Sequence, residues 1–293
     1  MAVRVEELKK YTVDRRCIDC QFRSFERLMN KFRISSDDRQ KFSRFYNDTM
    51  SRSAHLQTPQ IHRLLNDEFC RLAGSSDLYV EEKHQSNATA LRIINELRPE
   101  VEQSTNLFNL ALKLSIAGNI MDYGASGDFD IHATIQKVLT TNFAIDHSKE
   151  LENRMKLAKN ILYLGDNAGE IVFDKFFIET IHPENLTFAV RGSAVLNDAT
   201  LEDAKNIGLN KVVHVITNGY NAPSTILSES SPEFLKYYHE ADLIISKGQG
   251  NFEGLMHEYD PRIFFLLMVK CDVVSEVVGV EKGSFIVYNQ AIS

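Results

Sequence analysis

Short runs of β-branched and aromatic residues alternate with helical stretches in the second half of the chain, and this alternation most constrains the fold. The expected strands are 160–164, 186–190, 211–216, 242–246, 263–269 and 285–289. Segments 171–181, 199–209 and 231–241 between them have helical character. Because neighbouring parallel strands need a crossover connection, this pattern predicts an α/β fold with a mostly parallel sheet covered by helices on both faces.

The first half of the chain has a different period. Apolar residues recur at helical spacing, as in Phe22, Phe25, Met29 and Phe32. We therefore predict an all-helical domain over residues 1–156, followed by the α/β domain over residues 157–293. The Gly- and Asp-rich segment 124–130 is expected to be a loop between two helices of the first domain, with Asp130 as the N-cap of the second helix.

Polar residues and glycines follow four consecutive predicted strands, at the edge where parallel sheets bind their ligands. In chain order they include Asp166, Asn167 and Glu170, then Arg191, Asn197, Asp198 and Thr200, then Asn218 and Gly219, and then Lys247, Gly248, Gly250 and Asn251. Any one of them is most simply a turn former or a helix cap. Their joint occurrence favours a binding site.

The donor types at these strand ends indicate a particular chemistry. Carboxylate and amide oxygens beside a lysine and an arginine suit a divalent metal that also holds an anionic oxygen, most simply that of a phosphate. Gly165, Gly169, Gly248 and Gly250 would let backbone N–H groups approach the anion. The helix expected to begin near Ile171 would direct its positive end at the same anion.

Other classes of protein fit the sequence less well. Spacing excludes a P-loop and a G-x-S-x-G nucleophile elbow, and Gly248, Gly250 and Gly254 are spaced too widely for a dinucleotide fingerprint and precede no clear helix. Lys and Arg number 33 against 40 Asp and Glu, which argues against a nucleic-acid partner. The longest apolar run, Ile263 to Val269, is far below the ~18 residues of a membrane helix, and the charged start predicts a cytoplasmic protein.

Several segments together resemble the damage-control phosphatase family, formerly domain of unknown function family 89. They are GDNAGEIVFDK (165–175), VRGSAVLNDATLEDA (190–204), SKGQGNFEG (246–254), AGNIMDYG (117–124) and CIDC (17–20). The last of these is similar to the branch that carries an N-terminal Cys-x-x-Cys. The resemblance covers nearly the whole chain, and GDNAGE followed by NDAT is its most specific part.

The resemblance implies a helical N-terminal part, a Rossmann-like α/β/α part and a phosphatase that uses Mn, Co, Ni or Mg to act on small phosphorylated metabolites, including sugar phosphates. The family's metal ligands fall on Asp166, Asn167 and Asp198 of this sequence. The expected catalytic residues are Asp166, Glu170, Arg191 and Lys247, and the expected substrate-binding residues are Asn87, Asn119, Gly248 and Gly250.

Two choices stay open at this point. The nucleophile is either a water whose pKa the metal lowers or the carboxylate of Asp166, while Lys247 and Arg191 are expected to neutralise phosphate oxygens. The alternative function is a non-enzymatic protein that binds a phosphorylated metabolite or a nucleotide. A carboxyl methyltransferase, which has been discussed for eukaryotic relatives, ranks third because nothing in the chain suggests a methyl-donor site.

The chain has four cysteines, too few for a disulfide scaffold. Cys17 and Cys20 have a spacing that suits zinc, and Cys271, with Cys70 or a histidine, could complete a site of about four ligands. Packed thiols are the simpler interpretation, because one Cys-x-x-Cys motif is a weak signal. The sequence leaves the oligomeric state open.

Overall fold

The computed structural model of the chain describes residues 13–118 and 139–292. The chain divides into two compact units, Met1–Ser76 and Asp77–Ser293. Three sequence predictions, the 124–130 loop, its cap Asp130 and the substrate contact Asn119, lie outside the described residues.

The described residues of the first unit form three helices, α1 (Arg15–Lys31), α2 (Ser36–Arg52) and α3 (Thr58–Ala73). Its core is aromatic. Phe25 packs on both Phe42 and Phe69, with ring centroids 5.0 and 5.8 Å apart. The helical spacing of apolar residues therefore builds a small core within this unit alone.

The second unit contains a seven-stranded sheet of order β1-β7-β6-β5-β2-β3-β4. The strands are β1 (Ile145–Asp146), β2 (Ile161–Leu164), β3 (Leu186–Val190), β4 (His214–Thr217), β5 (Leu243–Lys247), β6 (Ile263–Met268) and β7 (Phe285–Tyr288). Among these strands, β6 and β7 pair antiparallel and every other neighbouring pair is parallel. Every residue of the interior strand β2 is buried, as expected for a parallel strand covered on both faces.

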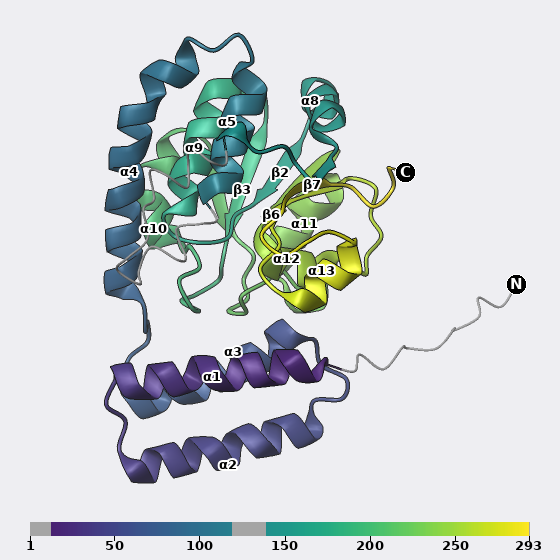
Figure 1. Cartoon of the computed structure of the whole chain (residues 1–293). Coiled ribbons are helices and arrows are strands. Elements are labelled where there is room, and N and C mark those ends of the chain that lie inside the picture. Colours follow the sequence, from purple (N-terminus) through teal and green to yellow (C-terminus); the bar gives the residue numbers. More distant parts are fainter. Residues whose placement is uncertain (1–12, 119–138, 293) are drawn as a thin grey trace, which may run out of the picture. The chain divides into compact units, whose positions relative to one another are not determined.

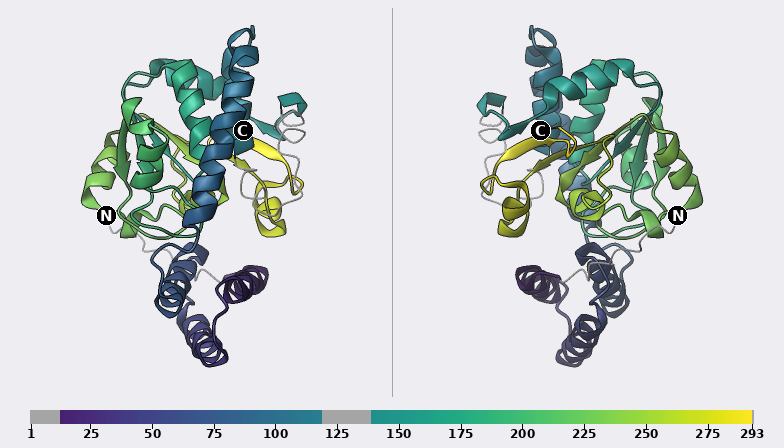
Figure 2. Two further views of the ribbon diagram at one scale, coloured as in Figure 1. Left: turned by 90° about the vertical axis from the view of Figure 1, so that its left-hand side faces the viewer. Right: turned by 90° about the vertical axis from the view of Figure 1, so that its right-hand side faces the viewer.

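Helices cover the sheet on both faces (Figures 1 and 2). They are α4 (Val80–Glu102), α5 (Leu107–Ala117), α8 (Ser148–Leu157), α9 (Glu170–Ile181), α10 (Leu201–Asn206), α11 (Pro232–Glu240), α12 (Gly248–Leu255) and α13 (Asp272–Val278), with short 3-10 turns at Leu209–Lys211 and Leu227–Glu229. One core lies between the sheet and α4, α5, α8, α9 and α10, and the other lies between the sheet and α11, α12 and α13. Neighbouring residues of β2 face opposite cores, since Tyr163 belongs to the first and Leu162 to the second.

The predicted α/β fold with a mostly parallel sheet is confirmed, and each predicted strand has its counterpart. Three details differ from the predictions. Strand β4 begins at His214 rather than at residue 211, because a 3-10 turn precedes it. The short strand β1 lies in the half that was predicted to be all helical. Helix α12 begins at Gly248, where no clear helix was expected, because this glycine-rich sequence is weakly helical by itself.

The division into compact units also differs from the boundary predicted at residues 156/157. It falls between Ser76 and Asp77, so α4, α5 and α8 belong to the same unit as the sheet. The reason is packing: α4 and α5 lie against α9 and share its core. Helical period alone does not reveal which neighbour a helix buries its apolar face against.

Candidate active site

The first part of the site is the turn between β2 and α9, which contains Asp166 and Asn167, both buried. Gly169 closes this turn with φ of 80°, a conformation that favours glycine, and α9 begins at the next residue. The Gly169 N–H donates to Oδ1 of Asn87 at 2.7 Å. A side chain of α4 therefore holds the amino end of α9 in place.

The second part is the turn after β3, and the backbone joins it directly to the first. Asn167 and Asp198 form an isolated antiparallel bridge. The Ala168 N–H donates to the Asn197 carbonyl at 2.9 Å, and the Ala199 N–H donates to the Asp166 carbonyl at 2.8 Å. These main-chain bonds bring Asp166, Asn167 and Asp198 together, although the two aspartates are 32 positions apart in the sequence.

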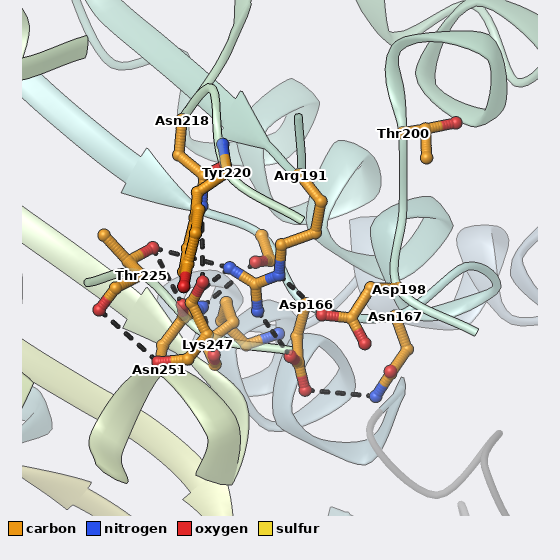
Figure 3. Close-up of polar contacts among 12 residues, drawn as sticks. Asp166, Asn167, Arg191, Asp198, Thr200, Asn218, Tyr220, Thr225, Lys247 and Asn251 are labelled. Atoms are coloured by element: carbon orange, nitrogen blue, oxygen red, sulfur yellow. Dashed lines mark hydrogen bonds and ion pairs between the residues drawn. The ribbon is translucent and has the colours of Figure 1, made fainter. Parts of the chain in front are cut away.

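Arg191 lies between the two aspartates and is only 2% exposed. Its Nη2 donates to Asp166 Oδ1 at 3.1 Å and its Nε donates to Asp198 Oδ2 at 2.5 Å. Its Nη1 donates to Oδ1 of Asn251 at 2.8 Å. Figure 3 shows the guanidinium directed at both carboxylates, while Nδ2 of Asn167 reaches the other oxygen of Asp166 at 3.0 Å.

The surroundings of Asp166 oppose its ionisation. Burial raises the pKa of Asp166 well above its ordinary value, and the negative charges of Asp198 and Glu170 raise it further. The positive charges of Arg191 and Lys270 act in the opposite direction. Burial and the neighbouring negative charges therefore outweigh the positive charges of Arg191 and Lys270 in setting the pKa of Asp166.

Lys247 occupies a separate buried group of charges. It is fully buried, and its Nζ pairs with Oε1 of Glu170 at 2.7 Å and with Oδ1 of Asp174 at 2.5 Å. The same oxygen of Asp174 also accepts a hydrogen bond from the Tyr163 hydroxyl. Burial raises the pKa of Asp174 to about 6, despite the opposing effect of Lys247. Burial would lower the pKa of Lys247, but Asp174 and Glu170 raise it, so the lysine is protonated.

The two glycines after β5 lie close to Asp166. A Cβ atom at Gly248 would lie 1.9 Å from Asp166 Oδ2, and φ at this residue is 77°. A Cβ atom at Gly250 would lie 2.1 Å from the Pro223 carbonyl oxygen. Both positions therefore need glycine, and at Gly248 the reason is direct contact with a predicted metal ligand.

The structure brings the predicted residues into two adjoining groups rather than one. Asp166, Asn167, Arg191 and Asp198 form the first, with Gly248 against it. Lys247 and Glu170 form the second, away from solvent. The predicted contact of Lys247 with phosphate thus differs from the arrangement seen, because its Nζ donates to Asp174 and to the Ser115 carbonyl and forms an ion pair with Glu170.

Sequence reasoning named Asn251 among the polar residues at the strand ends without assigning it a role, and it missed two further residues of this region, Asp174 and Lys270. Asn251 orients Arg191, Asp174 neutralises Lys247, and the half-buried Lys270 follows β6 and acts electrostatically on Asp166. The position of Lys270 after the carboxyl end of a predicted strand was a usable signal. Nothing in the local sequence distinguishes Asp174 from an ordinary helical polar residue, or indicates that Asn251 orients Arg191.

The donor set fits a divalent cation. Two carboxylates and one amide are hard oxygen donors of the kind that Mg²⁺ and Mn²⁺ prefer. The described ranges contain no group of three or more His, Cys, Asp and Glu side chains that could hold a metal. The present set has only two such side chains, because its third member, Asn167, is an amide. The amide Nδ2 of Asn87 is buried without a hydrogen-bond partner in the described ranges, which fits a nearby oxygen acceptor from a ligand.

The cysteines give no support to a zinc site in the described part of the chain. Cys271 has a structural role at the start of α13. Its Sγ accepts a hydrogen bond from the Val274 N–H at 3.5 Å and another from Nε2 of Gln249 at 3.4 Å. The packed-thiol interpretation accounts for this residue.

A cavity of about 530 Å³ lies at the opposite edge of the sheet, at the amino ends of β2, β3 and β4. Its polar lining includes Tyr237, whose hydroxyl lies 3.1 Å from Nε2 of the exposed His214. The pair of buried carboxylates lies at the other, carboxyl edge, where ligands of parallel sheets bind. In the described part of the chain, no helix combines the length and apolar character needed to cross a membrane.

Fold and site together define a three-layer α/β/α protein with a buried carboxylate and amide cluster at the carboxyl ends of parallel strands. Residues 13–286 match the family model of the damage-control phosphatase ARMT1-like domain. The chain therefore belongs to the damage-control phosphatase family.

Individual relatives agree with this assignment. A damage-control phosphatase of Pyrococcus horikoshii is 37% identical over 75% of this chain and 77% of its own length, and one of Archaeoglobus fulgidus is 34% identical over 80% and 81%. An uncharacterised protein of Methanocaldococcus jannaschii is 38% identical over 76% and 75%. The crystal structure of a duf89 family protein from Pyrococcus horikoshii matches with a TM-score of 0.85 and 32% identity, covering 95% of this chain and 99% of that one.

Proposed function

We propose that this phosphatase is a divalent-metal-dependent phosphomonoesterase that acts on small phosphorylated metabolites, sugar phosphates among them. The observation that carries the proposal is the placement of Asp166, Asn167 and Asp198 on two turns that main-chain hydrogen bonds hold together. The names of the Pyrococcus and Archaeoglobus relatives support phosphate removal as the reaction. The raised pKa of the buried Asp166 carboxyl, with the negative charge of Asp198 beside it, supports a cation at this place.

In this proposal Asp166, Asn167 and Asp198 hold a Mn²⁺, Co²⁺, Ni²⁺ or Mg²⁺ ion. When bound, such an ion supplies positive charge to the phosphate and lowers the pKa of a water. Both oxygens of Asp166 already accept hydrogen bonds, one from Arg191 and one from Asn167. This arrangement favours water over Asp166 as the nucleophile, because an engaged carboxylate is a weaker attacking group.

The remaining roles follow from burial and charge. Arg191 holds the two aspartates side by side, and Lys247 neutralises Glu170 and Asp174 beneath the turn. Lys270 is more accessible than either and is near enough to influence Asp166, so we assign it the task of neutralising phosphate oxygens. The Nδ2 of Asn87, which has no hydrogen-bond partner among the described residues, and the amino end of α9 are the proposed contacts for a substrate oxygen.

The test is phosphate release from a panel of sugar phosphates and p-nitrophenyl phosphate by metal-stripped protein refilled separately with Mn²⁺, Co²⁺, Ni²⁺ or Mg²⁺. Asp198→Asn keeps the size of a ligand but removes its charge. We expect it to lower kcat/KM more than about a hundredfold, since even residues that only support metal ligands cost ~10–100-fold. Asp48→Ala, at an exposed carboxylate of α2, is the matched control and should stay at the wild-type rate.

Full activity in the folded Asp198→Asn protein would contradict the ligand assignment. Absence of turnover with every metal, in wild-type protein that still binds these esters, would instead favour the non-enzymatic binding function.

A further inference from the structure

Helix α4 contacts the turn that carries Asp166 and Asn167, and it contacts helix α10, which follows the turn that carries Asp198. Asn87 accepts the hydrogen bond from the Gly169 N–H, and a Cβ atom at Gly169 would lie 2.9 Å from Cβ of Ser86. One turn earlier on the same helix, Lys83 reaches the segment that follows Asp198. Residues at i, i+3 and i+4 share one helix face, so a single face of α4 contacts the first turn directly and reaches the segment after the second turn through Asp203 of α10.

Lys83 is bound to this segment through Asp203. Its Nζ lies 3.0 Å from Asp203 Oδ2 and 2.7 Å from Asp77 Oδ2. The same oxygen of Asp203 accepts hydrogen bonds from the Thr200 N–H at 3.0 Å and from the Thr200 hydroxyl at 2.7 Å. Thr200 is two residues from Asp198, so a continuous set of bonds runs from α4 to the proposed ligand.

Burial sets this ion pair apart from an ordinary helix cap. The side chains of Lys83 and Asp203 are 4% and 3% exposed. Thr200 and Asp203 alone suffice for a capping box, which needs no lysine from 120 residues earlier. A buried lysine costs desolvation free energy that an apolar residue would avoid. Burial alone would lower its pKa, but Asp77 and Asp203 raise it, so Lys83 keeps its charge.

We infer that Lys83 is a positioning residue for the metal site, which fixes the turn bearing Asp198 relative to the turn bearing Asp166 through its buried pair with Asp203. This inference rests on the proposed function, because it takes Asp166, Asn167 and Asp198 as the metal ligands. Lys83 touches neither metal nor substrate in this role. Its effect is therefore on metal affinity, with catalysis following from it.

The experiment measures Mn²⁺ affinity by isothermal titration calorimetry on the full-length protein. Variants that remove the pair, Lys83→Met and Asp203→Asn, should bind Mn²⁺ ~10–100-fold more weakly than wild type. The double variant should be no weaker than the weaker single variant, because both substitutions break one connection. Lys83→Arg, which keeps the charge, should recover most of the affinity, and saturating Mn²⁺ should restore kcat in Lys83→Met.

Arg98→Met is the matched control. Arg98 also lies on α4 and pairs with Glu179 of α9 at 2.8 Å, so its loss removes a similar helix-to-helix ion pair away from the turns. Its Mn²⁺ affinity should equal that of wild type, whatever happens to its melting temperature.

The inference would be overturned by wild-type Mn²⁺ affinity in Lys83→Met, or in the isosteric Asp203→Asn should Lys83→Met fail to fold. The ion pair would then have a role in stability alone. Absence of Mn²⁺ binding by the wild-type protein itself would overturn the proposed function, and the inference with it, so the two failures are distinguishable.

Discussion

Gly248 shows how much of the site depends on a single missing side chain. It is the first residue after β5, with φ of 77°, and its Cα lies directly against the carboxylate of Asp166. Any other residue would place a Cβ atom 1.9 Å from Asp166 Oδ2. The backbone after β5 can therefore support Asp166 only because this position is glycine.

Gly248→Ala should disable the site more than it destabilises the protein. The left-handed conformation costs alanine about 1–2 kcal/mol of folding free energy. In addition, the methyl group must displace the Asp166 carboxylate, so Mn²⁺ affinity and kcat/KM should both fall. Calorimetry, steady-state kinetics and thermal melting of the variant would measure these effects.

Gly279→Ala separates the two contributions. Gly279 has φ of 73°, but a Cβ atom there would meet nothing within 4 Å. It should lose a similar amount of stability while its metal affinity and turnover stay at wild-type levels. Equal losses of activity in both variants would refute the direct effect on Asp166.

For single residues, the sequence could indicate which side chains supply oxygen donors to the site. It could not indicate which groups the cationic side chains pair with. Asp166, Asn167 and Asp198 follow predicted strands, and parallel pairing brings strand ends together. Lys247 follows a strand in the same way, yet it is directed into the protein toward Glu170. Which way a side chain at a strand end is directed depends on packing that the linear pattern does not contain.

Among the helices, α3 contains a buried titratable group in an aromatic core. His62 stacks on Phe25 with ring centroids 5.2 Å apart, and its Nε2 is buried without a hydrogen-bond partner among the described residues. Burial lowers the pKa of His62 to about 4, from an ordinary value of 6.5. Protonation of this ring is therefore opposed by folding of the three-helix unit.

The three-helix unit should lose stability on mild acidification. The unfolded chain takes up the proton near pH 6.5, whereas the folded unit resists it down to about pH 4. This contribution to stability is complete above the unfolded pKa and declines as the pH falls through that window, by about 2 kcal/mol at pH 5. Hydrogen exchange of α1, α2 and α3 peptides, corrected for intrinsic rates, would measure the local unfolding free energy.

His62→Phe keeps an aromatic ring at this position but cannot be protonated there. Its local unfolding free energy should fall less between pH 7 and pH 5 than that of the wild type, whereas His55→Gln, at an exposed histidine, should behave as wild type does. An unchanged pH dependence in His62→Phe would attribute the acid sensitivity to other groups.

Elements with a strong period could be predicted, and weak ones could not. Strand β3 (Leu186–Val190) matches its predicted range because a run of β-branched and aromatic residues is bounded by turn residues. Strand β1 is two residues long and exists only because β7 pairs with it. Helix α12 contains three glycines and forms because tertiary packing overrides its low propensity.

For the whole molecule, the division at Ser76 and Asp77 has an experimental consequence. Residues 77–293 contain both cores of the sheet and every residue proposed for the metal site. Expressed alone, this segment should unfold cooperatively and bind Mn²⁺ as the full chain does, as measured by thermal melting and calorimetry. The same segment with Asp198→Asn is the control for site-specific binding.

A segment 77–293 that is molten, or that is folded but without Mn²⁺ affinity, would show that the division into compact units does not mark independent folding. The sequence could not supply this division, because α4 has a helical period like that of α1 to α3. The contacts of α4 and α5 with α9, and of α5 with β6, place these two helices with the sheet.

The order of the sheet also bears on how the protein is made. Strand β1 pairs with β7, joining Ile145 to Ile286, and among the described residues β7 is the only neighbour that β1 has in the sheet. During synthesis β1 therefore stays unpaired until Phe285–Tyr288 has left the ribosome. The edge of β6 that pairs with β7 stays unpaired for the same time. Unpaired strand edges are where nascent chains associate with one another, and such distant pairing is slow. Substitutions in β7 should thus affect the yield of folded protein in the cell before they affect its chemistry.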